Sequence, residues 1–246
     1  VQGVGTLIFG VYAVTSGQLN WSILRRHLWF FLTIGTLIGV STNMSYTAIA
    51  LIDPGTASML AKISTVFSLA FGVIWLGERL SRRQWLGAAI AVLGSVVIAF
   101  EPGGYLLRAG SLVILASTLL YALHTAIVKR YGGQIDFINF FFFRIFATTA
   151  MLFFIAAGQR LLVWPEADAW AIITLTAVVD IIISRVLYYV ALRRLNMSIH
   201  TIVLTLGPVA TILWSRILFG TLPGPGELLG GTTVLMGVML VPGPGR

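Results

Sequence analysis

The chain has 246 residues, of which 58% are hydrophobic and 10% are charged, and its mean hydropathy is +0.95. Soluble domains carry about 25% charged residues, so this composition excludes a water-soluble protein and indicates an integral membrane protein. The net charge of +8 does not indicate nucleic-acid binding, because the basic residues lie in short turns between apolar runs, and the lack of cysteine excludes disulfides and thiolate metal sites.

Nine apolar runs follow one another along the chain, and most approach the length of about 20 residues that a membrane-spanning helix needs. They are Val1–Thr15, Leu28–Leu51, Thr56–Leu76, Gln84–Phe100, Ser111–Val128, Phe137–Ala157, Trp170–Val190, Ser198–Phe219 and Leu228–Val241. The runs are continuously apolar rather than alternating, which argues against a β-barrel. Since a lipid-exposed segment must satisfy its own backbone groups, the sequence predicts an all-α bundle of about nine helices.

The basic residues of the loops predict the orientation of these helices. The loops on one side carry ten Lys and Arg residues: Arg25, Arg26, Arg79, Arg82, Arg83, Lys129, Arg130, Arg193, Arg194 and Arg246. The loops on the other side carry only Arg108 and Arg160. This positive-inside bias predicts a cytoplasmic C-terminus, in the cytoplasmic (inner) membrane if the protein is bacterial.

The chain contains an internal repeat with an offset of 143 residues. This offset aligns Gly77 with Gly220, Gly87 with Gly230 and Gly94 with Gly237, and Tyr46 with Tyr189. We therefore expect two repeats, residues 1–103 and 104–246. The first has no counterpart of the run 111–128, so about one helix is expected to be missing from its N-terminus. Five helices per half is an odd number, so the halves must insert with opposite topology, which is typical of secondary transporters.

The stretch 47–98 resembles the EamA-type unit of the drug/metabolite transporter superfamily. The resemblance rests on the sequence LGERLS at 76–81, followed by Gln84, Gly87 and Gly94. It implies ten helices, two cytoplasmic termini, and a central substrate cavity lined by the first, third and fourth helices of each half. Thr65 stands where the family has a proline in the first unit, which removes the usual cause of a kink in that helix.

Asp180 is the sharpest candidate for chemistry, because it lies about ten residues into an apolar run and a buried charge is costly. Ser184 and Tyr188 follow at i+4 and i+8, on the same face of an α-helix. Asp180 could bind a substrate amine or couple transport to a proton, since an apolar environment favours the neutral carboxyl. Equally, it could be a structural partner of Arg185 or of another buried basic residue.

Lys62, in the run Thr56–Leu76, is the second candidate among the ionisable residues. Its long side chain can reach the membrane interface or meet Asp180 across the two halves. Other polar candidates for substrate binding are Asn43 and Tyr46 in the second run and Ser117 and Tyr121 in the fifth. For any one of these residues an interhelical hydrogen bond is the favoured role, and the set indicates a cavity more strongly than its members do.

The sequence as a whole predicts a secondary transporter that exports small organic metabolites or drugs by alternating access. Its partners would be a small-molecule substrate and the lipid bilayer, with proton coupling possible and no nucleic acid. Motifs of hydrolases and of phosphate-binding loops are missing from the sequence, so we expect no enzyme, no cofactor and no metal. A channel and a non-transporting membrane assembly factor are the alternatives. The substrate, the coupling ion and the oligomeric state are not predicted.

Overall fold

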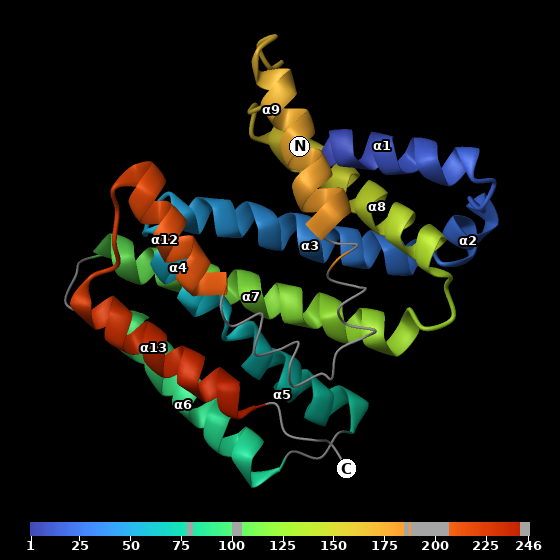
Figure 1. Cartoon of the computed structure of the whole chain (residues 1–246). Coiled ribbons are helices and arrows are strands. Elements are labelled where there is room, and N and C mark those ends of the chain that lie inside the picture. The colour runs from blue at the N-terminus through green and yellow to red at the C-terminus, as the bar shows by residue number, and fades with distance from the viewer. Residues whose placement is uncertain (78–80, 100–104, 185–186, 188–206, 242–246) are drawn as a thin grey trace. The chain divides into compact units, whose positions relative to one another are not determined.

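The computed structural model describes residues 1–77, 81–99, 105–184, 187 and 207–241, and within these ranges every regular element is helical (Figure 1). The elements are α1 (Gln2–Thr15), α2 (Trp21–Arg26), α3 (Leu28–Ile49), α4 (Pro54–Ala61), α5 (Ser64–Leu76), α6 (Arg82–Ala99), α7 (Tyr105–Tyr131), α8 (Phe137–Gly158), α9 (Ala169–Thr176), η1 (Ala177–Ser184), α12 (Gly207–Phe219) and α13 (Pro225–Leu240). The prediction of an all-helical protein is confirmed, and all nine apolar runs contain helix.

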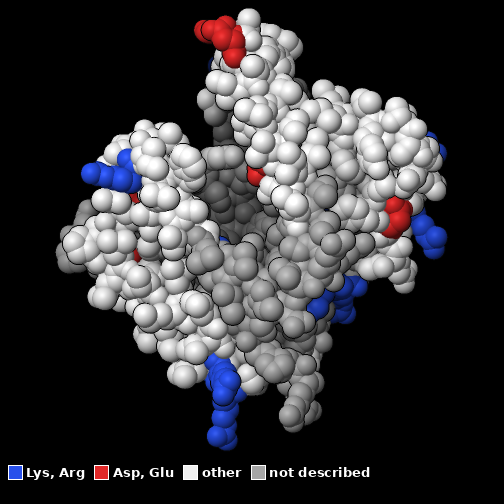
Figure 2. All heavy atoms as spheres, viewed as in Figure 1, with Lys and Arg blue, Asp and Glu red and all other residues white. Residues whose placement is uncertain are grey.

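Four helical segments are long and apolar enough to cross a membrane: Leu28–Ile49, Pro54–Trp75, Arg108–Tyr131 and Phe137–Gly158. The shorter apolar helices are Gln2–Thr15, Ala169–Ser184, Gly207–Phe219 and Pro225–Leu240. Much of the face shown in Figure 2 is uncharged, and its Lys, Arg, Asp and Glu side chains lie in small separate groups. Such a surface suits a hydrocarbon environment, in which ionised side chains are costly.

The chain forms two compact units, which are described separately. Unit 1 comprises residues 1–40 and 127–194. Its core is aromatic: the rings of Phe9 and Phe141 lie 4.8 Å apart and those of Phe31 and Phe143 lie 5.4 Å apart, all four being buried. Aromatic rings bury a large apolar area, and these tilted and edge-on contacts are favourable geometries. Helices α1, α3 and α8 are joined through them.

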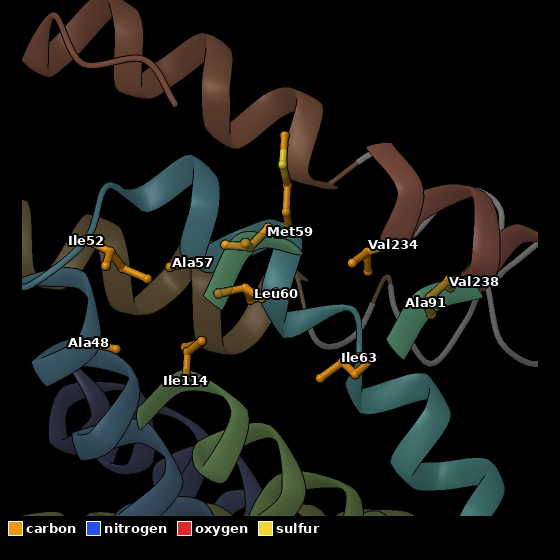
Figure 3. Close-up of a cluster of buried hydrophobic side chains, with 11 residues drawn as sticks. Ala48, Ile52, Ala57, Met59, Leu60, Ile63, Ala91, Ile114, Val234 and Val238 are labelled. Carbon is orange, nitrogen blue, oxygen red and sulfur yellow. The ribbon is translucent and has the colours of Figure 1, made fainter. Parts of the chain in front are cut away.

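Unit 2 comprises residues 41–126 and 195–246. Its core is aliphatic and gathers small and branched side chains from α3, α4, α6, α7 and α13. Its buried members are Ala48, Ile52, Ala57, Met59, Leu60, Ile63, Ala91, Ile98, Ile114, Val234 and Val238 (Figure 3). Met59, Leu60 and Ile63 place the end of α4 and the start of α5 in this core.

Helices α6 and α13 lie side by side in unit 2 (Figure 1) and approach each other through glycines. A Cβ atom on Gly87 would lie 2.5 Å from the carbonyl oxygen of Gly237, and one on Gly94 would lie 2.6 Å from that of Gly230. Only hydrogen fits at such distances, so these glycines permit the close antiparallel contact of the two helices. The four residues are the glycines that the 143-residue offset aligns.

Local sequence signals account for where the helices of the first hairpin begin and end. The Asp53 side chain accepts a hydrogen bond of 3.0 Å from the Thr56 amide, and Pro54 occupies the first turn of α4. Helix α5 ends at Gly77, whose φ of 69° is readily adopted by glycine. Gly220 ends α12 with a φ of 67°, so the two glycines that the 143-residue offset aligns each end a helix.

Candidate functional site

The most informative irregularity of unit 2 is a break in the third apolar run. Helix α4 ends at Ala61 and α5 begins at Ser64. Around the break the amides of Lys62 and Ile63 donate to the carbonyls of Met59 and Leu60, at 3.1 and 3.0 Å. These bonds connect residues three apart and tighten the chain to 3₁₀ geometry, which redirects the side chains that follow. The helix is therefore interrupted without a proline. The presence of Thr65 in place of the family's proline gave no reason to expect this interruption.

A cavity of about 470 Å³ opens in unit 2 at this break. It is enclosed by α3, α4, α5 and α7. Its lining residues are Ser41, Thr42, Ser45, Tyr46, Ile49, Ser58, Ala61, Lys62, Ser64, Ser117, Thr118 and Tyr121. Nine of these twelve side chains carry a hydroxyl group. Such a density of polar groups in an apolar helical unit is expected where a polar solute is bound. The volume of the cavity suits a small molecule.

Ser117 is the centre of a hydroxyl network in one wall of this cavity. Its Oγ lies 3.1 Å from Ser41 Oγ and 2.6 Å from Ser45 Oγ. Ser117 Oγ also donates to the carbonyl oxygen of Ser41, at 2.8 Å, and Ser41 Oγ donates to that of Ser117, at 2.9 Å. Small hydroxylated residues let helices α3 and α7 approach closely and bond across their contact. The network therefore holds this wall in place.

Lys62 lies at the break itself and is half-buried. It follows the last residue of α4, and the negative end of the helix dipole favours a cation there. A Cβ atom on Gly207, the first residue of α12, would lie 3.3 Å from Lys62 Nζ. The ammonium group therefore lies close to the backbone at the start of α12. Of the residues that line the cavity, Lys62 is the charged one, and that lining contains no Asp or Glu.

Four of the side chains predicted to bind substrate meet at this cavity, namely Tyr46, Lys62, Ser117 and Tyr121. Asn43 lies on α3 but is absent from the lining. Successive residues of an α-helix are turned by about 100°, which points Asn43 about 200° away from Ser41. Tyr46 is turned only about 60° from Asn43, so their common binding face stays a prediction.

Asp180 and Ser184 lie in unit 1, on η1, and both are exposed. Tyr188 lies outside the described residues, as does Arg185. Segment η1 is a π-helix, which is rare and occurs often at functional sites. Ile181, the residue after Asp180, is buried and packs against α1. A Cβ atom added to Gly5 of α1 would lie 2.9 Å from the Ile181 side chain. The Lys62–Asp180 contact would join the two units and stays a prediction.

A larger cavity, of about 720 Å³, lies in unit 1 along α1 and α8. Its lining is apolar apart from Trp21 and three threonines, Thr6, Thr15 and Thr149. The threonine hydroxyls are engaged, since Thr15 bonds the backbone of its own helix and Thr6 bonds Thr149. A cavity without orienting polar groups offers little specificity for a polar solute. The smaller, hydroxyl-lined cavity of unit 2 is therefore the better candidate for a binding site.

Two segments of the chain, residues 3–100 and 108–242, match the EamA-like transporter family. Together they cover nearly all of the 246 residues. The chain belongs to the EamA-like transporter family. This membership and its long apolar helices make it a multi-pass integral membrane protein, in a family of transporters rather than of enzymes.

Several curated proteins are similar to this EamA-like chain. It is 27% identical over 191 residues to a probable terminal-alkyne amino-acid exporter of Streptantibioticus cattleyicolor, covering 77% of the chain and 64% of the relative. It is 28% identical over 190 residues to the uncharacterized transporter YdfC of Bacillus subtilis, covering 76% and 62%. UDP-xylose transporter 2 of Arabidopsis thaliana is 36% identical over 72 residues, 29% of the chain and 20% of that protein. The chain thus spans less than two thirds of the length of the first two relatives.

The crystal structure of another protein has a similar fold, with a TM-score of 0.60 and 17% sequence identity. The superposition covers 97% of this EamA-like chain and 83% of the other chain. At this identity the similarity establishes a shared fold alone. Within the described ranges, no group of three His, Asp or Glu side chains lies close enough to hold a metal ion.

Several hydroxyl groups of the cavity were missed by the sequence reasoning, in particular Ser41, Ser45 and Ser64. A signal for the first two existed, because they are spaced four residues apart on one face of α3. Ser64 could not be assigned from spacing, since the break at Lys62 changes the direction of side chains between α4 and α5.

Proposed function

We propose that this EamA-like protein is a secondary transporter that exports a small organic metabolite by alternating access. The observation that carries the proposal is the hydroxyl-lined cavity at the interrupted α4–α5 segment. Interrupted helices commonly form the substrate site of secondary transporters, because the break exposes backbone groups and redirects side chains inside a protected cavity. Tyr46, Lys62, Ser117 and Tyr121 would contact the substrate there.

The proposed mechanism includes two repeats, residues 1–103 and 104–246, inserted with opposite topology in the cytoplasmic membrane. The excess of basic residues in alternate loops supports a cytoplasmic C-terminus. Rocking of one repeat against the other would expose the cavity to each side in turn. Export, rather than import, is suggested by the relative named as an amino-acid exporter. The relatives named for amino acids and for UDP-xylose differ too much to select one substrate.

Asp180 and Ser184 would serve coupling rather than line the cavity of unit 2. Asp180 places a carboxyl group on a π-helix within an apolar segment, and π-helical turns are frequent at functional sites. We propose Asp180 as the proton-coupling residue of the transport cycle.

Counterflow in proteoliposomes tests the transport proposal. Vesicles are loaded with one unlabelled solute from a panel of amino acids, organic acids, sugar phosphates and amines, and uptake of the labelled solute is followed. A carrier accumulates label transiently by exchange, a channel only equilibrates it, and an assembly factor does neither. Failure to exchange any solute would contradict the proposal.

A pair of variants ties this activity to the cavity. Ser58→Leu places a larger side chain in the lining and should abolish exchange. Thr47→Leu is the matched control, because Thr47 is exposed on α3 and does not line the cavity. Equal exchange by both variants would show that the substrate binds elsewhere.

A further inference from the structure

We infer that the cavity of unit 2 selects an anionic solute, whose carboxylate or phosphate group is bound by Lys62. This inference rests on the proposed transport function and names the substrate class of the same site. It starts from the charge of the lining: Lys62 supplies a cation, nine side chains carry hydroxyl groups, and no Asp or Glu belongs to the lining. A solute with a negative group would gain attraction from the Lys62 ammonium group, whereas an amine would be repelled by it.

The position of Lys62 also argues for a functional charge. An ionised lysine within an apolar segment costs about 2.5–3.5 kcal/mol on insertion scales, so it is expected to face a cavity or a partner. Lys62 is half-buried and lines a cavity that is large enough for a small organic ion. Its ammonium group lies near the first residue of α12. The charge is therefore held at a defined place rather than at the end of a free side chain.

The geometry of the break adds further donors beside Lys62. Helix α5 starts at Ser64, which lines the same cavity. The amides of Thr65 and Val66 already donate to the carbonyls of Lys62 and Ile63, at 3.1 and 2.9 Å, so the donors that α5 offers here come from its side chains. Ser58 lies in the lining on the other side of the break. An oxyanion at Lys62 could thus accept hydrogen bonds from an ammonium group and from hydroxyl groups on both sides of the interruption.

A structural role is the alternative explanation for Lys62, in which its ammonium group only stabilises the packing of α12 near the break. The two roles differ in what a substitution changes. Loss of a structural contact lowers the thermal stability of the protein equally with every solute. Loss of a binding group lowers the response to anions and leaves the response to other solutes unchanged.

The test is a ligand-dependent thermal stability measurement on the purified protein in detergent. Glutarate, glutaramide and cadaverine share a five-carbon skeleton and differ in charge, while glycerol 3-phosphate and glycerol form a matched pair for phosphate. We expect glutarate or glycerol 3-phosphate to raise the unfolding temperature of the wild-type protein, and the pair that responds distinguishes a carboxylate from a phosphate site. The neutral and cationic solutes should have smaller effects.

Substitution of Lys62 then assigns the effect. Lys62→Arg should keep the preference for anions, and Lys62→Met should weaken the apparent anion affinity by about ten-fold or more, as expected for a charged hydrogen bond. Lys62→Glu should reverse the preference towards cadaverine. Lys129→Met is the control, because Lys129 is the other lysine of the chain and lies in the basic last turn of α7.

The inference is overturned if no anion stabilises the wild-type protein, if cadaverine does so better, or if Lys62→Met responds like Lys129→Met. Counterflow separates this failure from failure of the transport proposal. Exchange of neutral or cationic solutes only would keep the transporter and exclude the anion site, whereas no exchange of any solute would exclude the transporter itself.

Discussion

The hydroxyl groups of Thr6 and Thr149 lie 2.7 Å apart and are hydrogen-bonded to each other across α1 and α8. The two residues are 143 positions apart, which is the offset of the internal repeat. In an arrangement with two-fold symmetry, equivalent residues touch each other only on the axis, and other contacts occur in exchanged pairs. Gly87–Gly237 and Gly94–Gly230 are such an exchanged pair. Both contacts support the proposed duplication with inversion.

The threonine pair should contribute a small, measurable coupling energy to stability. Thr6 Oγ1 also bonds the carbonyl oxygen of Gln2, at 3.0 Å, so Thr149 is the expected donor of the pair. A double-mutant cycle of Thr6→Val and Thr149→Val should give about 0.6 kcal/mol, the average for side-chain hydrogen bonds between membrane helices. Unfolding in detergent measures it. Thr15→Val serves as the control, because Thr15 bonds its own helix, and additivity of the two valine substitutions would contradict the prediction.

Gly94→Ala should destabilise the contact of α6 with α13. The added methyl group would lie 2.6 Å from the carbonyl oxygen of Gly230, so one helix must move away. Overpacking of this kind costs about 1–3 kcal/mol. The measurement is the temperature at which the detergent-solubilised protein loses its monodisperse peak in size-exclusion chromatography. Gly158→Ala is the control, because a Cβ atom there meets no atom within 4 Å. Equal effects of the two substitutions would show that the glycines are not needed for packing.

The turns that follow Gly77 and Gly220 should lie on opposite faces of the membrane, although the repeat aligns them. The chain has no cysteine, so a single introduced cysteine can be labelled without background. We expect an impermeant maleimide to modify Leu222→Cys in intact cells. It should modify Ser81→Cys only after the membrane is permeabilised. Ser81 and Leu222 are both exposed in the structure. Labelling of both positions from the same side would exclude inverted repeats.

Asp180→Asn should abolish transport or separate it from the proton gradient while the protein still inserts. The amide keeps the size of the side chain but cannot release a proton. Counterflow and gradient-driven uptake, measured at several pH values with an exchanged solute, distinguish a dead carrier from an uncoupled one. Asp168→Asn provides the comparison, since Asp168 is exposed next to the start of α9. Unchanged transport with an unchanged pH profile in Asp180→Asn would remove Asp180 from the mechanism.

The sequence predicted which parts of the chain are helical and that the protein lies in a membrane. Hydrophobicity summed along a run is sufficient for this, because lipid leaves a continuous apolar segment with few alternatives to a helix. The start of α4 at the Asp53 cap and the end of α5 at Gly77 are local features as well, since a capping carboxylate and a glycine with positive φ act on their own turn of helix. The family resemblance named from the LGERLS stretch is confirmed as well.

The meeting of Tyr46, Lys62, Ser117 and Tyr121 around one cavity was decided only by the tertiary structure. Each lies on a different helix or at a different depth, and a sum of hydropathy along the chain does not say which helices become neighbours or which face each one presents. The interruption at Lys62 was also seen only in the tertiary structure, where Leu60 and Ile63 beside it are buried in the core of unit 2. Local signals therefore determined the elements, and packing among distant segments determined the site.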